Sequence, residues 1–381
     1  MNSYERFDAI LNHKKPDKMP FYFPAIVCTV ASEILGRDVD NGGESLHFKE
    51  ELSFLSGDAA HDEFEKKFHQ DAIELNRKLK ADIVRQTWRS SQRPTKRIDE
   101  YTLLFGKEDG PHIIKRFFPE QQTYAVMEDT TGPKDTDELV KFLSEEMRKD
   151  CRVSDDFLEN TYSDQLNFKK LADPYFPTMV KGLGLGIPMH STIWLEATAL
   201  EPEVLSEYFM YCAEKTAQHV KWLHRKGFRY INGGADIASS RGPIYSPSSF
   251  KRIMVPALNR LMDECHKYGM VYCYKSDGNL WVIADCLFKE VGIPSYGEVD
   301  RDASMTVRKL REFYPDLIIL GNISSATLHK GTEKDVREET RATLEESGGY
   351  NYIAGPSNAI MHGTPVRNIY AMIDEIEKYK P

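Results

Sequence analysis

The sequence has few cysteines, and they follow no regular spacing. They are Cys28, Cys151, Cys212, Cys265, Cys273 and Cys286, and no two of them form a Cys-x-x-Cys pair. A disulfide framework requires a regular set of cysteines in an oxidising compartment, so this pattern predicts reduced thiols in a cytoplasmic protein. Metal binding by some of these thiols stays open at this point.

The chain also lacks an excess of positive charge and long apolar runs. Its 381 residues include 50 lysines and arginines against 59 aspartates and glutamates, which gives a formal net charge of −9. A nucleic-acid-binding protein would carry a basic face, so that class is disfavoured. No stretch approaches the ~18 uncharged apolar residues of a membrane span. Residues 1–6 contain no basic segment followed by an apolar one, so no secretory signal is expected.

From residue 176 onward, short apolar runs alternate with amphipathic, helix-like segments. This alternation is typical of βα units and a parallel sheet. With two earlier candidates, the predicted strands are centred near residues 21, 82, 178, 230, 272, 295, 319 and 352. Eight βα units predict a closed (β/α)8 barrel, and a doubly wound open sheet is the alternative.

Residues 88–130 interrupt the alternation of strands and helices. Short antiparallel strands are predicted over residues 102–105, 112–118 and 123–128, with Gly106 and Gly110 between the first two. We interpret this region as a β insertion over one end of a single barrel domain that spans residues 1–381. The glycine-rich residues 182–186 lack the Lys-Ser/Thr ending of a phosphate loop. They are predicted to form a flexible turn over a closely approached backbone.

The most informative stretch of the sequence runs from Met270 to Gly278. Its apolar half predicts a buried strand, which stops abruptly at Lys275-Ser276-Asp277-Gly278. Taken alone, these four residues are explained at least as well by an ordinary turn. The carboxyl ends of parallel strands are, however, where α/β proteins bind their ligands.

Other predicted strands also end in polar residues beside glycine. They place Asp236, Glu298, Asn322 and Asn358 at strand ends, and His190, Trp194 and Glu196 follow the strand near residue 178. In a barrel these residues converge on one mouth, which makes an active site there the favoured reading.

Several dispersed segments resemble the uroporphyrinogen decarboxylase superfamily, in the order in which that superfamily has them. Residues 6–11 and 15–20 are similar to its opening, and residues 234–236 with 241–247 to its fourth-strand region. Residues 276–279 resemble its Ser-Cys-Gly or Ser-Asp-Gly turn, and residues 363–368 its closing Thr-Pro-x-x-Asn. The resemblance implies a (β/α)8 barrel with its active site at the C-terminal mouth, but it does not by itself fix the reaction.

The resemblance leads to two branches with different chemistry. True decarboxylases carry an arginine-rich segment after the first strand that grips the many carboxylates of the substrate. Here residues 23–29 hold no arginine, and the next one is Arg37. A substrate with many carboxylates would lack its main counter-charges, so decarboxylation of a porphyrin precursor is disfavoured.

The other branch consists of corrinoid-dependent methyltransferases, some of which hold zinc. By position, the zinc ligands of those relatives correspond here to Lys275, Asp277 and Asn358. Zinc prefers thiolate and imidazole ligands, so we expect this zinc site, and thiol methylation with it, to be missing. What remains is transfer of a methyl group from an ether or an amine to a cobalamin (corrinoid) carried by a partner protein. A homodimer is expected by analogy only.

The hypothesis gives each candidate residue a role. Lys275 would supply the positive charge or proton that the leaving oxygen needs, and Asp277 would orient Lys275 or bind a substrate hydroxyl. Lys275 is favoured because it is the only lysine or arginine that a predicted strand places at its tip beside both a carboxylate and a glycine turn. The remaining candidates are proton-transfer groups of second rank (Asp236, Glu298, His190) and substrate-binding residues (Tyr22, Phe23, Trp194, Tyr245, Asn322, Asn358).

Three alternatives stay open at this point. Lys275 and Asp277 could form a structural ion pair at the barrel rim, and the aromatic residues could be ordinary core. The enzyme could be a decarboxylase or lyase of a smaller acid, with Lys275 holding the carboxylate. A barrel that has lost catalysis and serves as a binding module is disfavoured, because charges left at a buried rim without a role are costly.

Overall fold

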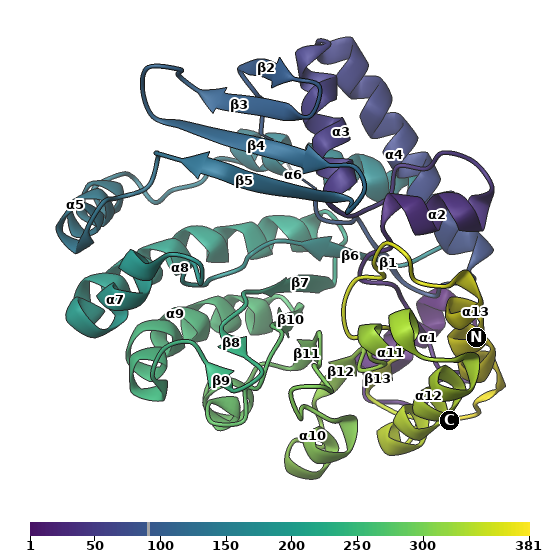
Figure 1. Ribbon diagram of the computed structural model, residues 1–381. Coiled ribbons are helices and arrows are strands. Elements are labelled where there is room, and N and C mark those ends of the chain that lie inside the picture. The colour runs from purple at the N-terminus through teal and green to yellow at the C-terminus, as the bar shows by residue number, and fades with distance from the viewer. Residues whose placement is uncertain (90–91) are drawn as a thin grey trace.

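The computed structural model describes residues 1–89 and 92–381, and its centre is a curled sheet of seven parallel strands (Figure 1). The strands are β1 (Val84–Arg85), β6 (Thr178–Lys181), β7 (Tyr230–Gly234), β10 (Val271–Lys275), β11 (Ser295–Gly297), β12 (Ile318–Leu320) and β13 (Tyr352–Ile353). Their order across the sheet is the same as their order along the chain. A doubly wound sheet reverses its order at a switch point, so that alternative is excluded.

The first predicted strand, near residue 21, does not form a regular strand. A single parallel bridge joins Phe21 to Ala354 beside β13, and the Asp82 amide donates to the Phe21 carbonyl on the side of β1. This segment therefore lies between the two edge strands, but the sheet is not closed by regular pairing. Pro20 and Pro24 bracket the segment, and prolines cannot donate to a strand ladder.

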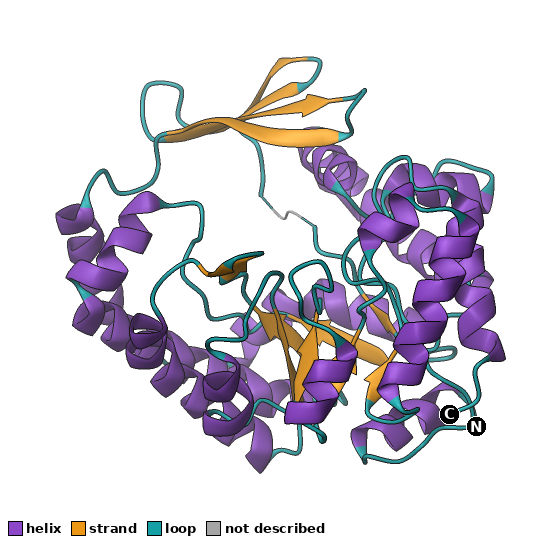
Figure 2. Cartoon of the chain, turned by 60° about the horizontal axis from the view of Figure 1, so that its bottom comes forward, coloured by secondary structure: helices purple, strands orange, loops and turns teal. Residues whose placement is uncertain are grey.

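Most of the helices lie around the outside of the curled sheet (Figures 1 and 2). The helices are α1 (Ser3–Leu11), α2 (Cys28–Leu35), α3 (Glu44–Leu55), α4 (Asp58–Lys78), α5 (Thr136–Met147), α6 (Asp155–Ala172), α7 (Thr192–Leu200), α8 (Pro202–Arg225), α9 (Pro247–Lys267), α10 (Val307–Phe313), α11 (Ser325–Lys330), α12 (Glu333–Ser347) and α13 (Val366–Lys378). Residues 280–291 form turns and a short π-helix, Cys286–Glu290, and no regular α-helix. Across the described ranges, no helix combines the length and the apolar character needed to cross a membrane.

Helix starts follow the capping residues of the sequence. Ser246 precedes α9 and accepts a hydrogen bond from the Ser249 amide, with Pro247 in the first turn. Asp135 caps α5 in the same way through the Glu138 amide. In both places a short polar side chain satisfies an amide that the first turn of the helix leaves unpaired.

A four-stranded antiparallel sheet follows β1 in the chain and lies apart from the parallel sheet (Figure 2). Its strands are β2 (Lys96–Asp99), β3 (Thr102–Gly106), β4 (His112–Phe118) and β5 (Thr123–Asp129). The last three coincide with predicted strands, whereas β2 was not predicted. The sheet is held to α3 by apolar contacts, among them Phe117 stacked on Phe48 with ring centroids 4.8 Å apart.

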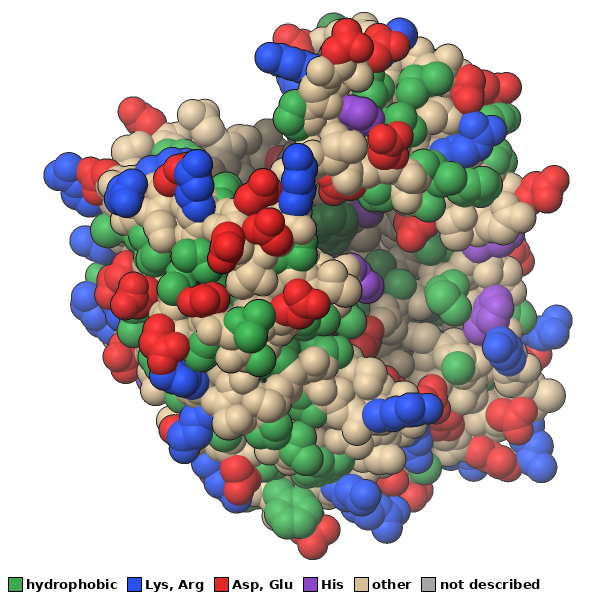
Figure 3. Space-filling view, turned by 60° about the vertical axis from the view of Figure 1, so that its left-hand side comes forward, with side chains coloured by type: hydrophobic (Ala, Val, Ile, Leu, Met, Phe, Trp, Pro, Cys, Tyr) green, Lys and Arg blue, Asp and Glu red, His purple; other side chains and the backbone are tan. Residues whose placement is uncertain are grey.

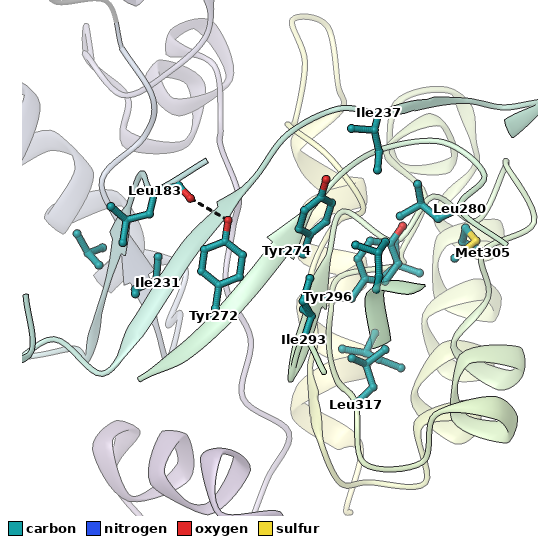
Figure 4. Close-up of a cluster of buried hydrophobic side chains, with 14 of the residues drawn as sticks. Leu183, Ile231, Ile237, Tyr272, Tyr274, Leu280, Ile293, Tyr296, Met305 and Leu317 are labelled. Atoms are coloured by element: carbon teal, nitrogen blue, oxygen red, sulfur yellow. Dashed lines mark hydrogen bonds between the residues drawn. The ribbon is translucent and has the colours of Figure 1, made fainter. Parts of the chain in front are cut away.

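Buried tyrosines join the strands of the parallel sheet to the segments that follow them. Tyr272, Tyr274 and Tyr296 are fully buried on β10 and β11 among aliphatic side chains (Figure 4). The Tyr272 hydroxyl donates to the Leu183 carbonyl at 2.9 Å and accepts from the Gly234 amide at 2.8 Å. It thereby ties the glycine-rich segment to the end of β7.

The glycines of residues 182–186 allow this segment to lie very close to the backbone at Gly234 and Ala235. A Cβ atom on Gly184 would lie 2.5 Å from the Gly234 carbonyl oxygen, and one on Gly186 would lie 2.1 Å from the Ala235 Cβ atom. Neither distance is possible without a shift of the chain. The prediction of a closely approached backbone is therefore confirmed.

Candidate active site

The carboxyl end of β10 carries a buried ion pair. Lys275 Nζ donates to Glu298 Oε1 at 2.7 Å, and the two side chains are only 9% and 19% exposed. The register of the sheet explains the contact, because Lys275 pairs with Gly297, the residue before Glu298. Gly297 has no side chain, so the aliphatic stem of Lys275 can lie directly over it. Lys275 therefore pairs with Glu298, and the expectation that Asp277 orients it is not met.

The ion pair keeps both of its members charged near neutral pH. Burial, the largest influence, lowers the pKa of Lys275, but the Glu298 carboxylate and Tyr22 together raise it above its usual value. Burial is also the largest influence on Glu298 and raises its pKa, but the Lys275 ammonium, together with Arg85, lowers it below its usual value. Lys275 is thus a fixed positive charge at the end of the strand.

Three carboxylates gather beside this ion pair. One oxygen each from Asp236, Asp277 and Glu298 lies within 4.8 Å of the others. The Asp277 amide donates to Asp236 Oδ1 at 3.2 Å, and Asn358 Nδ2 donates to Asp277 Oδ2 at 2.6 Å. Residues from four segments of the chain, each following a different strand, therefore meet as predicted from their positions at strand ends.

The Asp277 carboxyl has a pKa near neutral pH. Burial raises its pKa from 3.8 to about 7, and the negative charges of Glu298, Asp236 and Asp300 act in the same direction, while Lys275 opposes them. Asp277 is therefore present in both its protonated and its ionised form near pH 7. A carboxyl in this state can both give and accept a proton.

Asp277 should make the stability of the protein fall as pH rises from about 4 to about 7. Between the unfolded pKa of 3.8 and the folded pKa of about 7, the native state binds more protons than the unfolded state, so a rise in pH favours unfolding. The Asp277→Asn variant lacks this titration. Urea unfolding of both proteins at several pH values should show the wild type losing stability relative to the variant over this range. A constant difference would mean that Asp277 titrates normally.

The remaining predicted site residues form two groups. Some lie close to the Lys275–Glu298 ion pair, and the others lie in other parts of the fold. Tyr22 is buried with its ring centroid 5.8 Å from Lys275 Nζ, and its hydroxyl has no hydrogen-bond partner among the described residues. Asn322 is buried and donates to the carbonyls of Val299 and Met305, so it holds the segment that follows β11. Tyr22 is thus part of the site. Asn322 instead fixes the backbone of the segment that follows β11 and carries Glu298.

Four predicted residues lie in other surroundings. Phe23 packs edge-on against Phe21 in the core, and Tyr245 is buried near Phe250. Trp194 packs against Tyr208 and Phe209 of α8 and lines a separate cavity of about 480 Å³. His190 is exposed in the turn before α7. No contact described for these side chains joins them to Lys275.

Two further cations lie at strand tips and were not predicted as site residues. Arg85 ends β1 and Lys181 ends β6, so Lys275 is not alone in this position. The signal was available, because both follow short apolar runs that the sequence already marked as strands. They were missed because no carboxylate follows either of them directly in the chain, although the glycines of residues 182–186 follow Lys181.

A large polar cavity, of about 730 Å³, lies next to the end of β6. Its lining includes Glu50, Arg89, Asp164 and Lys181. Arg89 is held by carboxylates of Glu50, Glu65 and Asp164. Burial lowers the pKa of Lys181 to about 8 and raises that of Glu50 to about 8. In Figure 3 the surface is deeply hollowed, with histidine side chains on the walls of the hollow.

The chain matches the sequence model of one known protein family. Residues 188–379 match the model of the uroporphyrinogen decarboxylase family (URO-D). The chain belongs to this family. The matched region contains Asp236, Lys275, Asp277, Glu298 and Asn358. It does not reach Arg85 or Lys181. A search of curated proteins found no significant match.

Among solved structures, a methyltransferase from Methanosarcina mazei is similar over almost the entire length. It covers 99% of both chains with a TM-score of 0.66 at 16% sequence identity, which shows a shared fold. A B12-independent methionine synthase from Shewanella sp. W3-18-1 covers 83% of this chain and 89% of its own with a TM-score of 0.38 at 13% identity. A 3-keto-D-glucoside 4-epimerase from E. coli covers 65% of this chain and 95% of its own, with a TM-score of 0.34 at 14% identity. The last two are too distant to support an argument.

Proposed function

We propose that this member of the URO-D family is a methyltransferase that takes a methyl group from a small methoxylated or methylamine-type molecule and passes it to a corrinoid carried by a partner protein. The observation that carries the proposal is the buried Lys275–Glu298 pair, which presents a fixed positive charge beside a carboxyl of near-neutral pKa. The family and the whole-chain likeness to a methyltransferase support it. We take the curled sheet, with the segment around Phe21, to be a (β/α)8 barrel in one domain.

The chain's residues meet the demands of this reaction. The bond from the methyl carbon to oxygen breaks, and the oxygen gains negative charge as it leaves. Lys275 stabilises that charge in a water-poor site, where a preorganised cation is most effective. Asp277 then gives the oxygen its proton, because its pKa lies near 7.

A corrinoid held by its own protein would supply the methyl acceptor and must reach the site from outside. Asp236 is exposed and shares the cluster with the half-buried Asp277, so the cluster opens to the surface. An approach from that side would bring a partner-held group to the methyl carbon without entering the barrel core. This arrangement fits an acceptor that the chain does not itself bind permanently.

Decarboxylation of a small acid is the less favoured alternative. It would require Lys275 to hold the carboxylate of the substrate in addition to Glu298, so that one ammonium would face two full negative charges. In methyl transfer the oxygen gains its charge only as it leaves, and Asp277 then protonates it, so Lys275 can keep Glu298 as its partner.

The assay that tests the proposal follows the absorption spectrum of cobalt. The purified protein is mixed with a reduced corrinoid protein and with a panel of methoxylated aromatics and methylamines. We expect the spectrum of the methylated corrinoid to develop only when both the enzyme and a suitable donor are present. Formation of carbon dioxide from a small acid, with no change at cobalt across the panel, would instead favour the decarboxylase. A gene for a cobalamin-binding protein beside this one would support methyl transfer.

Zinc should not bind tightly at the position that some relatives use for it. Lys275 and Glu298 are bonded to one another, as are Asn358 and Asp277, and this set contains neither a thiolate nor an imidazole. The three carboxylates suit a hard cation such as Mg²⁺ or Ca²⁺ better. Elemental analysis of the purified protein should therefore find no stoichiometric zinc. One zinc per chain that is lost in Asp277→Ala would contradict this prediction.

A further inference from the structure

Arg85, the last residue of β1, is an arginine without a structural partner. It is half-buried, and within residues 1–89 and 92–381 no carboxylate or carbonyl accepts a hydrogen bond from its guanidinium. Its Nε atom is fully buried and unpaired. A guanidinium has five donors and keeps its charge at any ordinary pH, so burying part of it without an acceptor costs free energy.

Two other arginines, Arg89 and Arg311, also leave their Nε atoms buried without a partner, but their terminal nitrogens are bonded within the protein. Those of Arg89, four residues further along the chain, are held by three carboxylates. Those of Arg311 donate to backbone carbonyls, including those of Pro315 and Leu317. The terminal nitrogens of Arg85 have no such acceptor among the described residues, so they are free to bind one from outside the chain.

The position of Arg85 points to the candidate active site. It ends a strand of the parallel sheet, so it lies on the same rim as Lys275, which ends β10. The charge of Arg85 acts on Tyr22, Lys275 and Glu298, so all four groups share one electrostatic environment. A molecule bound at Lys275 can therefore also meet Arg85.

We propose that Arg85 binds a carboxylate of the substrate, so that the methyl donor is an acid that also carries a methoxy or methylamino group. The proposal rests on the function proposed above and names its substrate class. The planar guanidinium can hold a carboxylate through two parallel hydrogen bonds, which fixes orientation as well as position. A singly charged anion is favoured over a phosphate, because Asp236 and Glu298 already bring negative charge to the mouth.

Two-point binding would explain how the donor is oriented. With its carboxylate on Arg85, the donor would be free to direct its methylated end toward Lys275, where the leaving oxygen needs a positive charge. Tyr22, buried beside Lys275, would limit the space between the two ends.

Calorimetric titration with matched probes tests this proposal without any methyl transfer. The probes are 4-methoxybenzoate and methoxyacetate, each compared with its neutral amide. Wild-type protein should bind at least one acid about tenfold or more tightly than its amide, as a charge-assisted pair predicts. Arg85→Gln should abolish this preference, and Arg85→Lys should keep part of it. Arg308→Gln is the control, because it removes an exposed arginine from α10 and should change nothing.

A second measurement uses only the wild-type protein. Phenylglyoxal modifies accessible arginines, so mass spectrometry of treated protein should find Arg85 modified, and 4-methoxybenzoate should protect it while the amide should not. Equal binding of acids and amides by the wild type, or a preference that survives in folded Arg85→Gln, would overturn the proposal. If the preference depends on Arg85 but no donor methylates the corrinoid, the anion site stands and the proposed reaction is wrong.

Discussion

Replacing Lys275 with methionine should lower methyl transfer roughly a hundredfold or more, because a preorganised charge in a buried site commonly contributes about 3 kcal/mol to the transition state. Methionine keeps an unbranched stem of similar length, so the space over Gly297 stays filled. The Michaelis constant for the donor should change little, since the charge acts mainly on the leaving oxygen. Arginine should restore activity poorly, because its larger, planar guanidinium does not fit the place that the Lys275 ammonium occupies beside Glu298.

A double variant that combines Lys275→Met with Glu298→Gln distinguishes a catalytic role of Lys275 from a structural one. Lys275→Met alone leaves Glu298 buried without its cation, and part of any loss could come from that. The double variant removes both charges, so it should regain stability but remain as inactive as Lys275→Met. Lys169→Met serves as the control, because it breaks an ion pair with Asp173 far from the site. Near-normal turnover by Lys275→Met, or recovery in the double variant, would make the pair a purely structural rim contact.

Replacing Gly234 with alanine should destabilise the protein by about 3 kcal/mol or more, since overpacking adds to an unfavourable backbone conformation. Gly234 has φ +92°, and a Cβ atom there would lie 2.2 Å from the Lys275 amide nitrogen and 2.4 Å from its carbonyl oxygen. These atoms belong to the neighbouring strand, so they cannot rotate away. The strain would also displace Lys275 itself, and we expect activity to fall together with stability.

Gly269→Ala is the matched control for the alanine substitution at Gly234. Gly269 also has positive φ, +62°, but no atom lies within 4 Å of where a Cβ would be. It should therefore cost only about 1 kcal/mol, the price of the backbone conformation alone. Urea unfolding of both variants measures the difference. Equal losses would mean that the sheet adjusts around the added methyl group.

The positions of the site residues along their strands were predictable from the sequence, whereas their partners were not. An apolar run that stops at a polar residue marks the end of a buried strand, and parallel strands end on one rim. This is enough to bring Lys275, Asp277, Glu298 and Asn358 together. The pairing of Lys275 with Glu298 depends on the register of β10 with β11, which no local pattern reveals.

Side chains outside the strand tips were predicted less well, for related reasons. Phe23 lies within the first predicted strand and Trp194 follows the strand near residue 178, but the direction of an aromatic ring depends on what packs against it. Arg85 was passed over because the prediction sought polar residues beside a glycine turn. Its significance lies in the absence of a described partner, which only the folded chain reveals.

The hydroxyl of Tyr272 has a consequence for attempts to change the range of molecules that the enzyme accepts. It bonds Leu183 and Gly234 at once, and Gly184 and Gly186 leave no room for side chains, so this crossing cannot tolerate loop grafting or random diversification. The β8–β9 hairpin (Ala238–Ser239 and Gly242–Pro243) differs, because its exposed tip at residues 240–241 is free to vary. Libraries built at that tip should yield folded proteins with altered selectivity, whereas libraries at residues 182–186 should yield mostly insoluble ones.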